Sequence, residues 1–314
     1  MTIPTHNTNL RKLLETRNLG DADPFHNYWD CKNDTPSTAL QRLLELCIPK
    51  EELSLQPLTL QRVVDLTQKH WFVRQRWTIC DTPEIISNKK SIESCYNELG
   101  HASPVSAPDG HYPYILLLSA RVNVMTGRML SLQEKISTGK ITTDHIYILA
   151  GTQGLYKSEK EEDEYDILKN SKYNITSATT EEEAASELSQ HIFTPINIPT
   201  TVLATKLIGK NGNVVKPSTN DTVTTWFNSL PKDTDHSTLK VLFVSDSYFG
   251  NYQCNQILPL LQQKGIKQEN TFLLAEDLPE RKFTEIGMSK EKYETALGID
   301  IIARMFNDWN NLTK

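Results

Sequence analysis

The stretch Tyr114-Ile-Leu-Leu-Leu-Ser-Ala-Arg121 decides the fold class of this chain. It is a short apolar run that breaks at Ser119 into a polar loop. Three further apolar runs follow, separated by helical patterns: His145–Gly154, Thr201–Thr205 and Leu239–Asp246. Runs of about four to eight apolar residues that alternate with helices are typical of a parallel sheet buried on both faces. We therefore predict an α/β, Rossmann-like parallel sheet flanked by helices, with strands over residues 114–118, 145–150, 201–205 and 240–245.

The first third of the chain has a different pattern, which is mostly helical. Pro36 suits the first turn of a helix over residues 35–47, whose apolar side chains repeat at helical spacing. A second amphipathic stripe begins at Leu60 and ends near Trp77. We expect residues 1–110 to form a mainly helical region that packs on the core, and residues 111–314 to form the Rossmann-like domain with a C-terminal helix.

Composition and charge exclude several classes of protein. The 314 residues are 38% hydrophobic and 23% charged, as in an ordinary globular protein. The net charge of −6 argues against a general nucleic-acid binder, since phosphate binding needs clustered lysine and arginine. The 5 cysteines form no C-x-x-C pair, so we expect no disulfide framework. No apolar leader and no run near the roughly 18 residues of a membrane span is present, so we expect a cytoplasmic protein with no membrane span.

Several well-known catalytic and binding motifs are absent. The chain has no P-loop, no H-E-x-x-H and no G-x-S-x-G, and its histidines lack the spacing of a zinc site. Gly151-Thr-Gln-Gly154 lacks the full dinucleotide fingerprint, and Ser87-Asn-Lys-Lys90 matches S-x-x-K, a pattern frequent by chance. The acidic run from Lys157 to Asp166 is interpreted as a solvated insertion rather than as a lip that attracts metal.

Small and polar side chains follow the predicted strands, where ligands bind in open parallel sheets. Helix N-termini at these loops favour phosphate or carboxylate, and Arg121 adds a planar fork for an anion. Some polar residues around Glu183 and Ser218 could serve only as helix caps, without any ligand. Arg128 could instead form an ion pair with an acidic neighbour. The candidate ligand-binding residues are Ser119, Arg121, Arg128, Gly151, Thr152, Glu183, Ser218, Thr219, Asn220, Asp221, Ser245 and Asp246.

The order of these elements resembles the SanA/ElyC/YdcF-like family, a group of bacterial Rossmann-like proteins, with the soluble YdcF type most similar. The resemblance covers about residues 112–308. It rests on strand ends followed by an early arginine, on acidic and Ser/Asn-containing helix starts, and on the last helix, Tyr293–Asp308. The quoted motifs are Leu118-Ser-Ala-Arg121, Thr126-Gly-Arg128, Leu149-Ala-Gly-Thr152, Thr180-Glu-Glu-Glu183, Pro217-Ser-Thr-Asn-Asp-Thr222 and Val244-Ser245.

The resemblance implies a small adenosyl- or phosphate-type ligand, with S-adenosylmethionine or a nucleotide as candidates, and leaves the reaction open. The chain departs from the family pattern where the family has polar residues. The positions concerned are Val223, Thr224, Thr225, Phe249 and Tyr252, together with Thr152 in place of a second glycine. These departures favour an alternative: a catalytically silent protein of a host-associated bacterium that binds a protein partner through its helical N-terminal region.

Overall fold

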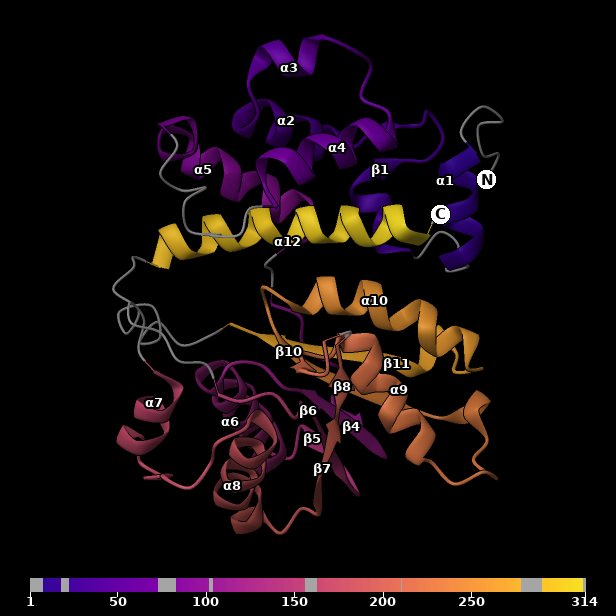
Figure 1. Ribbon diagram of the computed structural model, residues 1–314. Helices are drawn as coiled ribbons and strands as arrows, with labels where there is room; N and C mark the ends of the chain where they lie inside the picture. Colours follow the sequence, from indigo (N-terminus) through magenta and orange to yellow (C-terminus); the bar gives the residue numbers. More distant parts are fainter. Residues whose placement is uncertain are drawn as a thin grey trace. The chain divides into compact units, whose positions relative to one another are not determined.

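The computed structural model describes residues 8–17, 23–72, 83–101, 104–155, 163–209, 211–277 and 290–312 (Figure 1). The chain divides into two compact units. The helical unit comprises Met1–Ser103 and Met288–Lys314, and the sheet unit comprises Pro104–Gly287. Each unit is described by itself below.

A parallel sheet of five strands forms the centre of the sheet unit, as the apolar runs predicted. Its strands along the chain are β4 (Tyr114–Leu118), β6 (Ile146–Gly151), β7 (Thr200–Thr205), β10 (Val241–Asp246) and β11 (Thr271–Glu276). Their order across the sheet is β11-β10-β4-β6-β7, and every neighbouring pair is parallel. The four predicted strands are confirmed to within one residue at each end. The fifth strand, β11, was not predicted.

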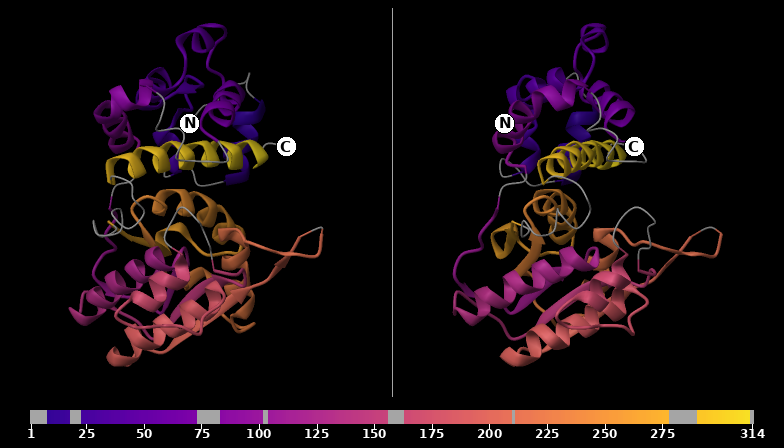
Figure 2. Two further views of the ribbon diagram at one scale, coloured as in Figure 1. Left: turned by 60° about the vertical axis from the view of Figure 1, so that its left-hand side comes forward. Right: turned by 90° about the vertical axis from the view of Figure 1, so that its left-hand side faces the viewer.

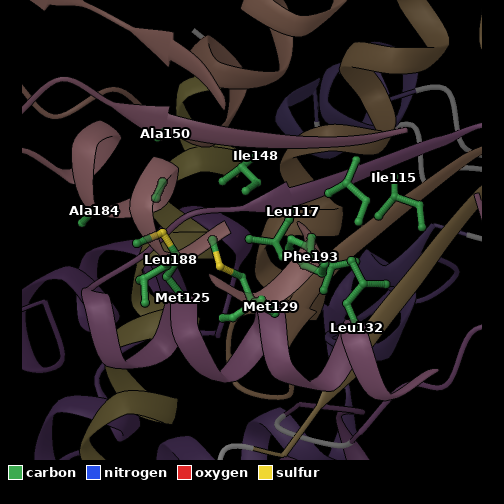
Figure 3. Close-up of a cluster of buried hydrophobic side chains, with 14 of the residues drawn as sticks. Ile115, Leu117, Met125, Met129, Leu132, Ile148, Ala150, Ala184, Leu188 and Phe193 are labelled. Atoms are coloured by element: carbon green, nitrogen blue, oxygen red, sulfur yellow. The ribbon is translucent and has the colours of Figure 1, made fainter. Parts of the chain in front are cut away.

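Helices cover both faces of this sheet. The longer ones are α6 (Val122–Ser137), α8 (Glu181–Phe193), α9 (Thr219–Ser229) and α10 (Gly250–Gln263). Helices α6 and α8 pack together on one face, and α9 and α10 pack together on the other (Figure 1). Figure 3 shows Met125 and Met129 of α6 directed at Leu117 and Ile148 of the sheet, beside Leu188 of α8. Burial of apolar side chains on both faces supplies the main stabilisation of this unit.

Smaller elements complete the sheet unit. They are β3 (Gly110–His111), β5 (Ile141–Thr142), α7 (Glu164–Asn170), η4 (Thr194–Ile196), β8 (Leu207–Ile208), β9 (Val214–Val215), η5 (His236–Thr238) and η6 (Gln268–Asn270). Strands β8 and β9 pair antiparallel between the end of β7 and the start of α9. Figure 2 shows this hairpin extending away from the sheet, and Ile208 in its first strand is 57% exposed.

The described part of the helical unit matches the prediction of a mainly helical N-terminal third. Its elements are α1 (Thr8–Arg17), η2 (Pro24–Asn27), β1 (Trp29–Asp30), β2 (Thr35–Pro36), α2 (Thr38–Cys47), α3 (Lys50–Ser54), α4 (Leu60–His70), α5 (Pro83–Glu98) and α12 (Lys290–Leu312). The predicted place of Pro36 in the first helical turn is wrong. Pro36 ends β2, and helix α2 begins later because the Ser37 hydroxyl accepts a hydrogen bond from Leu40 N at 3.3 Å. The predicted end near Trp77 lies outside the described residues.

The last helix belongs to the helical unit, whereas the sequence pattern grouped it with the α/β domain. Helix α12 packs against α1, α4 and α5. Tyr96 of α5 donates a hydrogen bond to Thr295 O at 2.8 Å, and Gln68 of α4 donates one to Ala303 O at 2.7 Å. Tyr28, Phe306 and Trp309 are buried together in the same unit. The apolar stripe of α12 therefore completes the core of the N-terminal helices.

Part of the acidic run from Lys157 to Asp166 lies among the described residues. Residues 157–162 of the run lie outside them. Asp163 caps α7, and the Glu164 side chain is buried, so the expectation of a wholly solvated insertion is wrong for Glu164. Among the helices that the structure describes, none has the length and apolar character that crossing a membrane requires.

Candidate functional site

The sheet changes its winding direction between β4 and β10. Counted along the chain, the strands lie in the order 3-2-1-4-5, and β4 is followed by α6 on one face while β10 is followed by α10 on the other. In open α/β sheets the crevice outside the strand ends at such a switch point is where ligands bind. The residues next to this point are Ser119 after β4 and Ser247 after β10.

A buried ion pair fixes the two strand ends at the switch point. Arg128 of α6 and Asp246 of β10 have side chains that are 1% and 0% exposed. Arg128 Nε and Nη2 lie 3.1 and 2.6 Å from Asp246 Oδ2, and Nη1 donates to the carbonyl oxygens of Leu118 and Ser119. The sequence predicted ligand contacts for both charged residues. Their internal bonds instead hold the ends of β4 and β10 against α6.

Glu181 joins the ends of two neighbouring strands through a single carboxylate. This residue is 8% exposed and lies in the first turn of α8. Its Oε1 accepts from Ser119 Oγ and from Gly151 N, the latter at 3.1 Å, and its Oε2 accepts from Gln153 Nε2. The structure thus brings Ser119 and Gly151 together, as expected for residues of one site, around a carboxylate that the sequence did not select.

Gly151 stands where a side chain does not fit. A Cβ atom at this position would lie 1.9 Å from Gln153 Oε1 and 2.9 Å from Pro217 Cδ. Pro217 directly precedes Ser218, the residue that caps α9. The close approach therefore places the start of α9 beside the end of β6, so that residues far apart in the sequence share one surface.

Capping boxes occupy the first turns of α8 and α9. Glu183 N donates to Thr180 Oγ1 at 3.2 Å, and the Glu183 carboxylate accepts from Thr180 N. Hydrogen bonds, chiefly from the Thr179 hydroxyl, lower the pKa of Glu183 below its usual range. In α9, Asp221 N donates to Ser218 Oγ at 3.3 Å, and Asp221 Oδ2 accepts from Ser218 N at 2.8 Å. The predicted residues Glu183, Ser218 and Asp221 thus act as helix caps in this structure.

Carboxylates also bind the backbone at the starts of α6 and α10. Glu164 Oε1 accepts from Val122 N, the first residue of α6, at 2.9 Å. Asp246 Oδ1 accepts from Tyr248 N and Phe249 N, both at 3.1 Å, in the loop that leads into α10. Each helix that begins at this end of the sheet therefore has an internal carboxylate at its N-terminal backbone, the position that suits an external anion.

Three buried polar atoms at the strand ends have no hydrogen-bond partner in the described structure. They are Thr152 Oγ1, Gln153 Oε1 and Ser247 Oγ. Ser247 is 1% exposed, and its loss of solvation is uncompensated. Neighbouring Ser245 differs, because its hydroxyl donates to Gln253 Oε1 on α10. Unpaired buried oxygens are costly to a folded protein, so their grouping here calls for an explanation.

The remaining predicted residues lie at the same end of the sheet with side chains near solvent. Arg121 is the exposed N-cap residue of α6, and its side chain makes no capping bond. Thr219 and Asn220 form the first turn of α9. Sequence reasoning missed Gln153, Glu164, Glu181 and Ser247. We use the name carboxyl-end site for Ser119, Gly151, Thr152, Gln153, Glu181, Asp246 and Ser247.

A shallow cavity of about 510 Å³ lies elsewhere in the sheet unit, beside the outer strand β11. None of the predicted ligand-binding residues lines it, although the sequence analysis placed ligands at the strand ends. Its walls come from α10, η6 and β11: Cys254, Leu258, Gln268, Glu269, Thr271, Phe272 and Leu273. Burial raises the pKa of the Cys254 thiol to about 12, so this thiol is protonated at neutral pH. In the described residues, no group of three or more His, Cys, Asp or Glu side chains is arranged to hold a metal ion.

Comparison of the chain with protein-family models, with curated proteins and with solved structures gave no match.

Proposed function

We propose that this protein binds a small ligand of the adenosyl type at the carboxyl-end site. The observation that carries the proposal is the group of unpartnered buried oxygens on Thr152, Gln153 and Ser247 at the strand ends. A bound ligand with hydroxyl or amino donors would satisfy them. The switch point of the sheet, where such ligands bind in related architectures, supports the same location. The resemblance to the YdcF type supports the ligand class.

The neighbouring groups suit recognition more than covalent chemistry. Glu181 is held by three internal donors, and Arg128 and Asp246 neutralise one another. Ser119 donates its hydroxyl to Glu181, whose carboxylate also accepts from Gly151 N and Gln153 Nε2. The site therefore offers positioned hydrogen-bond acceptors next to side chains that are held by internal bonds. We propose ligand binding at this site and no specific reaction.

The test uses the unpartnered hydroxyl groups themselves. Ser247→Ala and Thr152→Val each remove a hydroxyl that has no hydrogen-bond partner among the described residues, so the free energy of unfolding should stay equal or rise. Affinity for S-adenosylmethionine or adenosine, measured by calorimetric titration, should fall by roughly three- to ten-fold, the usual effect of one lost hydrogen bond. Stability and binding thus change in opposite directions.

The matched control is Ser245→Ala, which removes a hydroxyl that bonds to Gln253 within the protein. This variant should lose about 0.5–1.5 kcal/mol of stability and keep its affinity once folded. Failure of the wild-type protein to bind any adenosyl compound would refute the proposal. Equal affinity in wild type, Ser247→Ala and Thr152→Val would remove these oxygens from the site.

A second candidate function is protein recognition through the helical unit. The observation in its favour is Leu55, which is 71% exposed after α3, with Phe72 43% exposed after α4. Leu55→Ser should change the free energy of unfolding by less than about 0.5 kcal/mol, as is usual for exposed positions. If the helical unit binds a partner through this surface, the variant should lose that partner in a co-purification experiment that retains it for wild type.

A further inference from the structure

Carboxylates lie at the helix starts that border the carboxyl-end site. Glu164 lies at the start of α6, Glu181 and Glu183 at the start of α8, Asp221 at the start of α9, and Asp246 before α10. The guanidinium of Arg128 is fully engaged by Asp246 and two carbonyl oxygens. Arg121 is a second arginine at the rim, exposed to solvent. Among the described residues, Lys206 after β7 and Lys216 before α9 are also cations at this end of the sheet, whereas the carboxylates lie directly at the helix starts.

The backbone positions that hold phosphate in nucleotide-binding folds are filled by the protein itself. The first helix after a switch-point strand normally offers its free N–H groups to a phosphate. Here Val122 N, at the start of α6, donates to Glu164 Oε1 at 2.9 Å. On the β10 side, Tyr248 N and Phe249 N both donate to Asp246 Oδ1. A phosphate group would have to displace a carboxylate or lie beside it, and like charges at short range repel strongly.

A separate observation supports the proposed ligand at this site. Ser247 is 1% exposed, its hydroxyl has no hydrogen-bond partner in the part of the chain that the structure describes, and it directly follows β10. Gln153 donates a hydrogen bond from its amide nitrogen to Glu181, and its buried Oε1 has no partner among the described residues. Carboxylate, carbonyl and hydroxyl oxygens are acceptors for ligand hydroxyl groups, as in ribose recognition. We infer that the carboxyl-end site takes an uncharged or cationic nucleoside-type ligand and discriminates against ligands that carry phosphate.

This inference rests on the proposed function and adds the ligand's charge to it. The probes are adenosine and AMP, which differ by one phosphate, titrated calorimetrically in magnesium-free buffer at low salt. Adenosine should bind at least roughly ten-fold more tightly than AMP, because each near carboxylate adds repulsion in a site of low dielectric. High salt should reduce the ratio through screening.

The variants identify which carboxylate discriminates. Glu164→Gln keeps an acceptor for Val122 N and removes one negative charge, so it should raise AMP affinity relative to adenosine by roughly three- to ten-fold. Glu134→Gln is the matched control, because it makes the same change in the last part of α6, at the opposite end of the helix. It should leave the adenosine-to-AMP ratio at the wild-type value.

The outcomes separate the two proposals. Binding of AMP as tight as that of adenosine, or tighter, would overturn the charge discrimination while leaving an adenosyl site in place. An unchanged ratio in Glu164→Gln would also overturn it, since the carboxylate at α6 would then have no effect on phosphate. Absence of binding by adenosine, AMP and S-adenosylmethionine would refute the proposed function, and the charge discrimination with it.

Discussion

Arg128 Nη2 lies 2.6 Å from Asp246 Oδ2, and both side chains are removed from solvent. The pair connects α6 to the carboxyl end of β10 at the switch point of the sheet. Both charged groups lose their hydration on folding. If one partner were removed, water could not reach the other to solvate it. The relationship therefore makes the geometry of the carboxyl-end site depend on one buried contact.

Removal of one partner should be far more harmful than removal of both. Asp246→Ala leaves the Arg128 guanidinium buried and unpaired, and should lower the free energy of unfolding by about 3–5 kcal/mol. Arg128→Met combined with Asp246→Leu should cost less than Asp246→Ala alone, as measured by urea unfolding. Glu15→Ala is the control, since the Arg11–Glu15 pair is solvent-exposed and should contribute less than about 1 kcal/mol. Equal losses in all three variants would contradict this account of the pair.

Gly151→Ala should disturb the strand end through its neighbour Gln153. The new Cβ would lie 1.9 Å from Gln153 Oε1 and 2.9 Å from Pro217 Cδ, so Gln153 must leave its bond to Glu181. We expect a loss of about 1–3 kcal/mol in thermal or urea unfolding. Gly154→Ala is the matched control in the same loop, because its nearest atom would be Thr179 O at 3.8 Å. A Gly151→Ala protein as stable as the Gly154→Ala protein would show that the loop adapts freely.

The contact between α5 and α12 predicts that the effect of Gly298→Ala on stability changes sign when the Tyr96 ring is removed. A Cβ at Gly298 would lie 2.5 Å from the Tyr96 ring, which is held in place by its hydrogen bond to Thr295 O. Gly298→Ala should therefore destabilise the protein by about 1–3 kcal/mol. In a Tyr96→Leu background the clash is gone, and the same substitution should stabilise by up to about 1 kcal/mol through helix propensity. Urea unfolding of the four proteins tests this, and a stabilising Gly298→Ala in the wild-type background would contradict it.

His101 should make the stability of the protein sensitive to acid. Burial lowers the pKa of this imidazole to about 4, from an ordinary value of 6.5. The unfolded chain therefore binds a proton more readily, and stability falls as the pH drops through 6.5 towards 4. Between pH 7.5 and pH 5 this residue should cost roughly 2 kcal/mol. In His101→Gln, urea unfolding should show a pH dependence reduced by that amount. An unchanged dependence would show that His101 titrates normally in the folded protein.

The sheet could be predicted from the sequence because its strands are buried on both faces. Continuous apolar runs such as Ile115–Leu118 and Val241–Val244 are required where helices cover each side of a sheet, and such runs are easily recognised in the sequence. Strand β11 was missed although it contains the run Phe272–Ala275. It lies at the edge of the sheet, and the first half of the strand is only partly buried, so its apolar signal is shorter.

The location of the candidate site could be predicted, and the partners of its residues could not. Strand ends follow from the pattern, which is why Ser119 and Gly151 were selected. Glu183 was selected and Glu181 was missed, because the orientation of α8 decides which glutamate faces the sheet, and a run of three glutamates does not show that orientation. Glu164 was assigned to a solvated run because its bond to Val122 N depends on where α7 packs. Helix α12 was grouped with the sheet for a similar reason, since an apolar stripe shows that a helix is buried on one side but not which element packs against it.

The most direct test of the central claim is the location of the bound ligand. Hydrogen–deuterium exchange of the wild-type protein should be measured with and without saturating S-adenosylmethionine or adenosine. Binding at the carboxyl-end site predicts added protection in residues 119–122, 151–155 and 245–249, which surround the unpartnered oxygens of Thr152, Gln153 and Ser247. Protection confined to the cavity beside β11, at residues 254–273, or to the helical unit would contradict the claim.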